Sequence, residues 1–151
     1  MLRQLLSNAE FDTAVSSLEG FAVNVSSLWG KGYALLGNAG EFLDPVFSSG
    51  VTIALKSAHL AAPLVSRQLS GNHVDWQAEF AEPLEVGVNT FRSYVESWYD
   101  LSFQKAIFAE HKEARIKGMI CSILAGYAWD GANPFVKNTE RKLSALNFLC
   151  R

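Results

Sequence analysis

A stretch of small residues connects two unlike parts of the chain. From Gly37 to Val51 it reads GNAGEFLDPVFSSGV, a turn and a loop that lead into an apolar helix with no cation in its first turn. Backbone N–H groups around 48–51, at the positive end of the helix dipole, would form a site for an anion or an electron-rich carbonyl. Gly37, Ala39 and Gly40 would let a ligand approach the backbone closely. Such residues also serve structural roles in turns and helix caps, so the pattern alone leaves both interpretations open.

Short strands are predicted ahead of this stretch. Residues 21–28 alternate apolar and polar side chains, as a half-buried strand does, and the apolar run 33–36 is typical of a second strand. Residues 29–32 between them, Trp-Gly-Lys-Gly, favour a turn. The segment 2–18 is only weakly amphipathic. Because a lone strand pair is marginal in water, we expect these strands to join a larger sheet or to lie on the helices.

Helices are predicted for the rest of the chain. Residues 51–69 leave little polar surface, so this helix is expected to be buried on most sides, with Pro63 kinking it or tightening its last turn. Asp75 is placed to cap the next helix, a further helix with apolar spacing from Ile116 is predicted to end near Asp130, and the last is predicted from about Thr139. The predicted fold class is therefore mainly α with a short β pair.

Aromatic residues recur at helical spacing in the middle of the chain. The aromatic stripe consists of Phe91, Tyr94, Trp98, Phe103 and Phe108. A stripe of this kind more often packs into a core than lines a substrate pocket, so we expect it to be core. A substrate pocket remains the alternative.

Composition excludes several classes of protein. The chain has 151 residues, 13 Lys and Arg against 15 Asp and Glu, and 49% hydrophobic residues, as in a globular domain. With a formal net charge of -2 and no basic block, nucleic acid is not an expected partner. No apolar run reaches the about 18 residues of a membrane span, and no secretory signal is recognisable, so we expect a cytoplasmic protein. Cys121 and Cys150 indicate neither a disulfide framework nor a zinc site, and no metal site is predicted.

The small-residue stretch resembles the late flavin-binding motif of FAD-dependent oxidoreductases of the glutathione-reductase and hydroxylase type. The usual form of that motif is Gly-Asp-Ala followed by a Pro and a Gly-led helix. The run DPVFSSG, Asp44–Gly50, is similar to a characteristic run of the flavin-dependent (tryptophan) halogenase-like and geranylgeranyl-reductase-like branches. The likeness covers most of the chain and is weaker beyond this stretch.

The resemblance implies FAD as the cofactor and assigns residues to its parts. Gly37, Asn38 and Ala39 would lie near the ribityl-phosphate portion. The residues implied near the isoalloxazine ring are Pro45, Ser48, Ser49, Gly50 and Val51, in the loop that Asp44 opens. Amide donors at the helix start would stabilise negative charge on the reduced ring. Asn38 stands where the family usually has Asp, so a carbonyl acceptor is kept and the charge-assisted bond is lost.

The resemblance also implies parts that this sequence does not contain. No Gly-x-Gly-x-x-Gly follows a predicted first strand, although that fingerprint holds the ADP half of FAD. We therefore expect the C-terminal fragment of an α/β FAD-binding fold of the glutathione-reductase type. Residues 1–50 would form the end of the FAD-binding domain, with the strand pair and the flavin-facing loop. Residues 51–151 would form a helical C-terminal region, and the N-terminal dinucleotide-binding unit would be absent.

The expected parent is an FAD-dependent dehydrogenase, monooxygenase or halogenase-like enzyme that acts on a small organic substrate. This part would face the flavin and be inactive alone, and no catalytic residue is assigned. Because edge strands seek neighbours, we expect homo-oligomers or pairing with the missing N-terminal part. The alternative is a helical interaction or scaffold domain in which the flavin motif is a relic.

Overall fold

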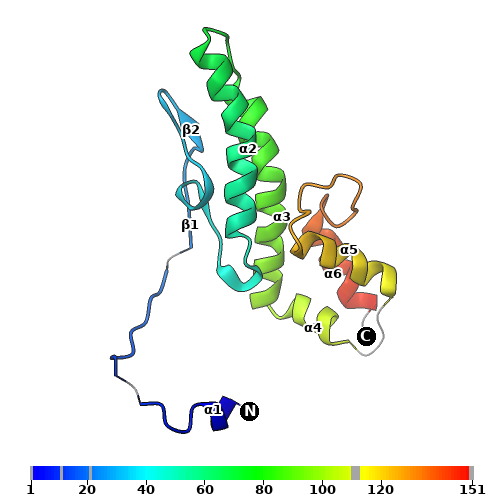
Figure 1. The fold of residues 1–151 in the computed structure, drawn as a ribbon. Helices are drawn as coiled ribbons and strands as arrows, with labels where there is room; N and C mark the ends of the chain where they lie inside the picture. Colours follow the sequence, from blue (N-terminus) through cyan, green and yellow to red (C-terminus); the bar gives the residue numbers. More distant parts are fainter. Residues whose placement is uncertain (1, 11, 21, 110–112, 150–151) are drawn as a thin grey trace.

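Two long helices form the centre of the molecule. The computed structural model describes residues 2–10, 12–20, 22–109 and 113–149. Helix α2 (Gly50–Leu69) and helix α3 (Glu82–Tyr99) lie side by side and run in opposite directions (Figure 1). Short strands lie along one side of this pair. Three smaller helices lie on the other side, namely α4 (Ser102–Phe108), α5 (Ala114–Leu124) and α6 (Thr139–Leu149).

The strands form two separate antiparallel pairs, each strand being two residues long. Strand β1 (Val23–Asn24) pairs with β4 (Glu41–Phe42). Strands β2 (Trp29–Gly30) and β3 (Tyr33–Ala34) form a hairpin. The predicted single β pair is therefore replaced by two short ones.

The strand predictions were right in place and wrong in extent. Of the predicted strand 21–28, Phe21 lies outside the described residues and only β1 pairs. Trp29 and Gly30 belong to β2, although a turn was predicted there, and the turn itself lies at Lys31 and Gly32. Strand β4 falls in a predicted loop, because its pairing depends on the distant β1 and not on local alternation.

Helix α2 begins one residue before its predicted start and continues through Pro63. The prediction that it is buried on most sides is wrong. One side is buried, at Ile53, Ser57, Ala61 and Leu64. Val51 and Leu55, on another side, are 72% and 69% exposed. Only one face is covered because α3 and the loop before α2 pack on that face.

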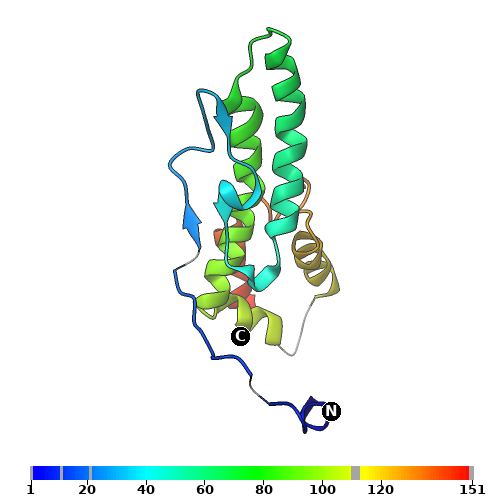
Figure 2. The ribbon, with the colours of Figure 1, turned by 60° about the vertical axis from the view of Figure 1, so that its left-hand side comes forward.

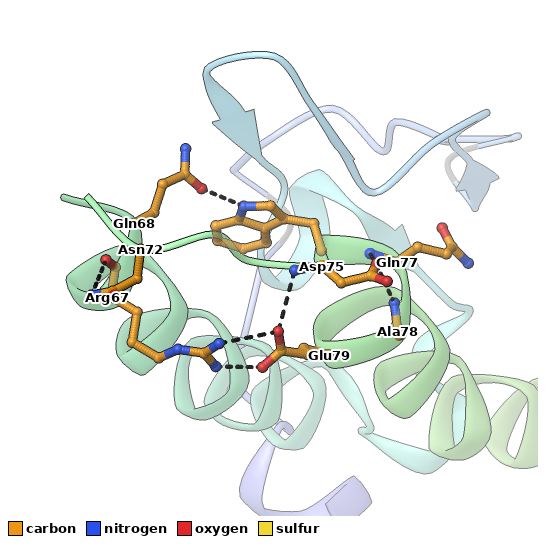
Figure 3. A network of polar contacts seen from close by, with 8 residues as sticks. Arg67, Gln68, Asn72, Asp75, Gln77, Ala78 and Glu79 are labelled. Carbon is orange, nitrogen blue, oxygen red and sulfur yellow. Dashed lines mark hydrogen bonds and ion pairs between the residues drawn. The ribbon is translucent and has the colours of Figure 1, made fainter. Parts of the chain in front are cut away.

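A polar network closes the turn between α2 and α3 (Figure 3). The Asp75 carboxylate accepts hydrogen bonds from the backbone amides of Gln77 and Ala78, at 3.1 and 3.0 Å, which confirms its predicted capping role. Arg67 near the end of α2 forms an ion pair with Glu79, and this pairing lowers the pKa of Glu79. The helix that Asp75 caps opens with a π-helical turn, η3 (Gln77–Ala81), that leads directly into α3.

The aromatic stripe is largely core, as predicted. Phe91, Tyr94 and Phe103 are at most 1% exposed, and Trp98 is half-buried. Phe108 departs from the prediction, with 72% of its surface exposed. The last helix begins at Thr139, as predicted. Helix α5 ends at Leu124, before its predicted end near Asp130, because Gly126 with a φ of 107° leaves the helical conformation.

The N-terminal segment lies apart from this core. It contains the short helix α1 (Leu2–Leu5) and extends away from the body of the molecule (Figures 1 and 2). Within the described ranges, no helix combines the length and the apolar character that a bilayer crossing requires.

Candidate functional site

The site begins where the chain turns onto helix α2. Gly37 opens a short 3-10 turn, η1 (Gly37–Ala39), with a φ of 53°, a left-handed conformation that favours glycine. Its N–H donates a hydrogen bond to Ser57 Oγ at 2.9 Å. A Cβ at this position would lie 3.0 Å from Ala54 Cβ. Gly37 is therefore required for the close contact of the turn with α2.

Asn38 and Ala39 remain exposed beside the start of α2. The Asn38 side-chain oxygen lies 3.4 Å from the place where a Cβ at Gly50 would sit. The two groups of predicted ligand residues, 37–39 and 48–51, therefore meet at the N-terminal end of α2.

A second 3-10 turn, η2 (Pro45–Phe47), leads into the helix. The Asp44 carboxylate accepts a hydrogen bond from the Val46 amide at 3.1 Å and so caps this turn. Ser48 has a φ of 53°, and its N–H donates to the Pro45 carbonyl at 2.8 Å. The expectation that Ser48 contributes a free amide is therefore wrong. The Asp44 carboxylate also raises the pKa of the nearby Tyr99 hydroxyl.

Phe47 anchors the loop, a role that the sequence analysis did not assign. Its ring makes edge contacts with Tyr94, Trp98 and Phe103, at centroid distances of 6.5, 5.7 and 5.8 Å. Edge-to-face packing of this kind is favourable between aromatic rings. The signal was available in the sequence, since Phe47 is the large aromatic residue of the DPVFSSG run.

The first turn of α2 presents unpaired amide donors. Ser49 is only 3% exposed and its side chain makes no capping hydrogen bond. Among the described residues, no acceptor is found for the amides of Ser49, Gly50, Val51 and Thr52. The first amides of any helix lack partners within the helix, and the helix dipole adds a positive potential there. The arrangement can therefore bind an electron-rich acceptor.

The loop after α5 also lies beside this helix start. Gly126, with a φ of 107°, brings the loop after α5 alongside it, because a Cβ at Gly126 would lie 3.4 Å from the Thr52 side chain. The neighbouring Tyr127 is 65% exposed. Gly126 therefore lies close to the amide donors, and it was not among the predicted site residues.

A partly buried ion pair holds the β1–β4 ladder against α3. Arg92 on α3 donates to the Glu41 carboxylate at 2.7 Å and to the Asn24 side-chain oxygen at 3.0 Å. Burial raises the pKa of Glu41, and the Arg92 guanidinium offsets this only in part. The pair therefore fixes the segment that immediately follows the η1 turn.

Comparison with known proteins identifies a brominase and several flavin-dependent halogenases as relatives. Over 79 residues the chain is 34% identical to the 1H-pyrrole-2-carbonyl-(peptidyl-carrier protein) brominase of Pseudoalteromonas luteoviolacea (strain 2ta16). The matched segment covers 52% of this chain and 19% of the brominase. Over 77 residues the chain is 32% identical to the flavin-dependent halogenase armH1 of Armillaria mellea. This matched segment covers 51% of the chain and 15% of the halogenase. No family model matches the chain.

A solved structure shows a similar fold. The crystal structure of a flavoprotein/dehydrogenase from Cytophaga hutchinsonii matches with a TM-score of 0.83 and 44% sequence identity, over 87% of this chain and 33% of that one. The chain therefore spans a third or less of the length of these proteins. Together the relatives confirm the resemblance drawn from residues 37–51, because the chain is similar to part of flavin-dependent halogenases and to part of a flavoprotein.

Proposed function

We propose that this chain forms the flavin-facing part of an FAD-dependent, halogenase-like oxidoreductase. The observation that carries the proposal is the set of unpaired amides from Ser49 to Thr52, which lies beside the Asn38 side-chain oxygen at the start of α2. The flavin-dependent relatives support the same assignment. Residues 1–50 would then be the end of the flavin-binding domain, and residues 51–151 its helical extension.

The donor set fits the pyrimidine edge of a flavin. That edge carries carbonyl and nitrogen acceptors, and it gains negative charge when the ring is reduced. Amide donors that are fixed before the reaction stabilise such charge without having to reorganise. Gly50 has no side chain to obstruct the approach of a flat ring, and Asp44 and Phe47 hold the preceding turn in place.

The chemistry of the reaction would come from the cofactor when it is bound. A flavin accepts electrons from a reductant and passes them to an organic substrate or to O2. The residues of this chain would bind the ring, orient it and tune its charge. Asn38, at the position of the family Asp, would contribute an uncharged acceptor toward the ribityl portion. Amides and the Asn38 side chain are neither acids nor bases, and the Asp44 carboxylate is engaged in capping the η2 turn, so no catalytic residue is assigned in this segment.

The proposal can be tested at the amides themselves. Isotope-labelled chain would be titrated with FMN, a soluble flavin, and followed by amide NMR. Because only the ring end of the cofactor would be held, binding should be weak, with a dissociation constant of about 0.1–1 mM. We expect the largest shifts at Ser49–Thr52 and at 37–39. Inorganic phosphate serves as the control for simple anion binding at a helix N-terminus.

A matched pair of variants separates the site from general effects on the helices. Gly50→Val would place a side chain in the path of the ring, and we expect at least about tenfold weaker binding, or about 1.4 kcal/mol. Gly118→Val makes the same change on α5, where a Cβ would meet no other atom within 4 Å, and should leave binding unchanged. Amides that do not move with FMN, or that move equally with phosphate, would contradict the proposal and favour the scaffold alternative.

A further inference from the structure

The core of the molecule contains a hydroxyl that has no hydrogen-bond partner. Tyr94 on α3 is 0% exposed. Among the residues that the structure describes, its hydroxyl oxygen is the one buried side-chain polar atom for which no partner is found. Buried hydroxyls are nearly always paired, because an unpaired one loses its hydrogen bonds to water and gains nothing in return. A phenylalanine would fill the same space without that cost, so packing alone does not explain the hydroxyl.

An acceptor for this hydroxyl has to come from the segment itself. Because the Tyr94 side chain has no exposed surface, neither a ligand nor another protein reaches it unless the surrounding residues move first. Burial also raises the pKa of the Tyr94 hydroxyl, so the group keeps its proton and remains a donor. The acceptor is therefore an oxygen that a rearrangement of neighbouring residues would bring to the hydroxyl.

The DPVFSSG loop is the neighbour that holds such oxygens. The Phe47 ring meets the Tyr94 ring edge-on at a centroid distance of 6.5 Å, and so joins the loop to this side chain. Within the described ranges, no donor is found for the backbone carbonyls of Val46, Phe47 and Ser48. These residues lead directly into the unpaired amides at 49–52. A shift of the loop that brings one of the carbonyls to the hydroxyl therefore also moves those amides.

The two segments that pack on Tyr94 both adjoin a residue with a left-handed backbone. The loop and α4 lie at the same end of α3 (Figure 1). Ser48, next to Phe47, has a φ of 53°, and Leu101, just before α4, has a φ of 67°. A left-handed residue after a helix is usually glycine, and a bulky side chain is costly there. Helix α4 also carries Phe103, whose ring centroid lies 5.0 Å from that of Tyr94. Such strain is typical of segments that switch between two conformations.

We infer that Tyr94 is a positioning residue for the amides at 49–52. In the present conformation its hydroxyl is unpaired, and in a second conformation of the loop it donates to a backbone carbonyl of residues 46–48. The second conformation is the one that receives the flavin ring, so that binding shifts the loop toward it. The inference rests on the proposed function for the identity of the ligand, whereas the second conformation is a property of the free chain.

The test compares the wild-type chain with Tyr94→Phe, which removes only the hydroxyl. Tyr33→Phe is the matched control, because it makes the same change at a side chain that is 52% exposed on the β2–β3 hairpin. Nitrogen-15 relaxation dispersion on the free proteins measures the population of a minor loop conformation on the μs–ms timescale. FMN titrations followed by amide NMR give the dissociation constants, and urea unfolding gives the stability.

We expect exchange at the amides of residues 46–50 in the wild type and in Tyr33→Phe. Tyr94→Phe should reduce the minor population by about threefold to tenfold, the effect of one net hydrogen bond. It should weaken FMN binding by the same factor, because the apparent affinity is proportional to the fraction of molecules in the binding conformation. Its urea midpoint should equal the wild-type midpoint or exceed it, because no hydrogen bond is lost from the major conformation.

A urea midpoint that falls in Tyr94→Phe but not in Tyr33→Phe would overturn the inference, since the hydroxyl would then already be bonded, to the protein or to an interior water. Exchange that is absent from the wild type, or unchanged in Tyr94→Phe, would also overturn it. The two proposals fail separately. Equal FMN affinities of the wild type and Tyr94→Phe would contradict only this inference. Exchange that Tyr94→Phe suppresses in a chain that does not bind FMN would support the second conformation and contradict the proposed function.

Discussion

Phe47 connects the DPVFSSG loop to the core. The turn on either side of it is held by short local hydrogen bonds, whereas its ring contacts residues on α3 and α4. Phe47→Ala should therefore lower the free energy of unfolding by about 3 kcal/mol, since it empties an aromatic pocket. Urea unfolding measures this. The neighbouring Val46→Ala, at a position 36% exposed, should change stability by less than about 0.5 kcal/mol. Equal losses in both variants would show that Phe47 is no anchor.

Glu41 should make the stability of the protein depend on pH. Burial raises the pKa of this carboxyl above its ordinary 4.5, so the folded state binds the proton more tightly than the unfolded state does. Its contribution is complete below pH 4.5 and is lost as the pH rises through the folded-state pKa. Relative to Glu41→Gln, the wild-type free energy of unfolding should therefore fall as the pH rises from 4.5 through the folded-state pKa of Glu41. Urea titrations of both proteins measure the difference. A wild type that gains stability relative to Glu41→Gln as the pH rises would show that the folded state lowers the pKa of Glu41.

At this scale the sequence predicted which residues meet at α2 but not their individual bonds. The DPVFSSG run is specific enough to indicate a turn followed by a helix. The hydrogen bond from the Gly37 amide to Ser57 could not be predicted, because it joins residues 20 positions apart and depends on how the turn packs on α2. The Ser48 amide is not available to a ligand because it donates to the Pro45 carbonyl. The left-handed backbone of Ser48 could not be predicted from a Ser in a loop.

Helix α3 and the loop after α5 are joined through Gly87 and Trp129. A Cβ at Gly87 would lie 2.1 Å from Trp129 Cε2, and the indole N–H donates to the Pro83 carbonyl at 2.9 Å. Gly87→Ala should therefore cost about 2 kcal/mol of stability through overpacking. Gly118→Ala, at an open position on α5, should instead stabilise by about 0.5–1 kcal/mol.

A double-mutant cycle checks the cause of that effect. If the indole ring is the obstacle, Gly87→Ala should cost little in a Trp129→Leu background, and the two changes should be strongly non-additive. Thermal unfolding of the four proteins gives the coupling. Additive effects would place the strain of Gly87→Ala elsewhere.

At the scale of elements, long periodic segments were predictable and short paired ones were not. The bounds of α2 and the start of α6 agree with the sequence because apolar spacing and terminal residues mark them. Strand β4 has two residues and no alternation to mark it. The one-sided burial of α2 could not be foreseen, since a helix with two apolar faces has the same pattern whether one face or both are covered.

The N-terminal segment should be dispensable for the stability of the whole molecule. The side chains of residues 2–20 whose burial is described are exposed, and the ribbon runs clear of the helices (Figure 1). Deleting residues 1–20 should change the free energy of unfolding by less than about 0.5 kcal/mol. Limited proteolysis should cut this segment first. A large loss of stability would show that the segment packs on the body.

For the whole molecule, the sequence predicted a mainly helical chain and a flavoprotein likeness, both of which are confirmed. What it could not supply is the arrangement in space. The η1 turn and the Gly126 loop reach the start of α2 from opposite directions along the chain. Only the packing of α2 against α3 and the smaller helices brings them together.

The loop between Gly37 and Gly50 is closed at both ends, because each end contacts or enters helix α2. The chain touches Ala54 of α2 at Gly37 and re-enters the same helix at Gly50. An inserted or deleted residue between these points would change the length of the closed loop. Either Gly37 would lose its contact with the helix or Phe47 would lose its aromatic contacts. Evolution can lengthen the β2–β3 hairpin at Lys31 and Gly32 freely, whereas insertions and deletions between Gly37 and Gly50 should be rare in relatives whose loop packs on α2 in this way.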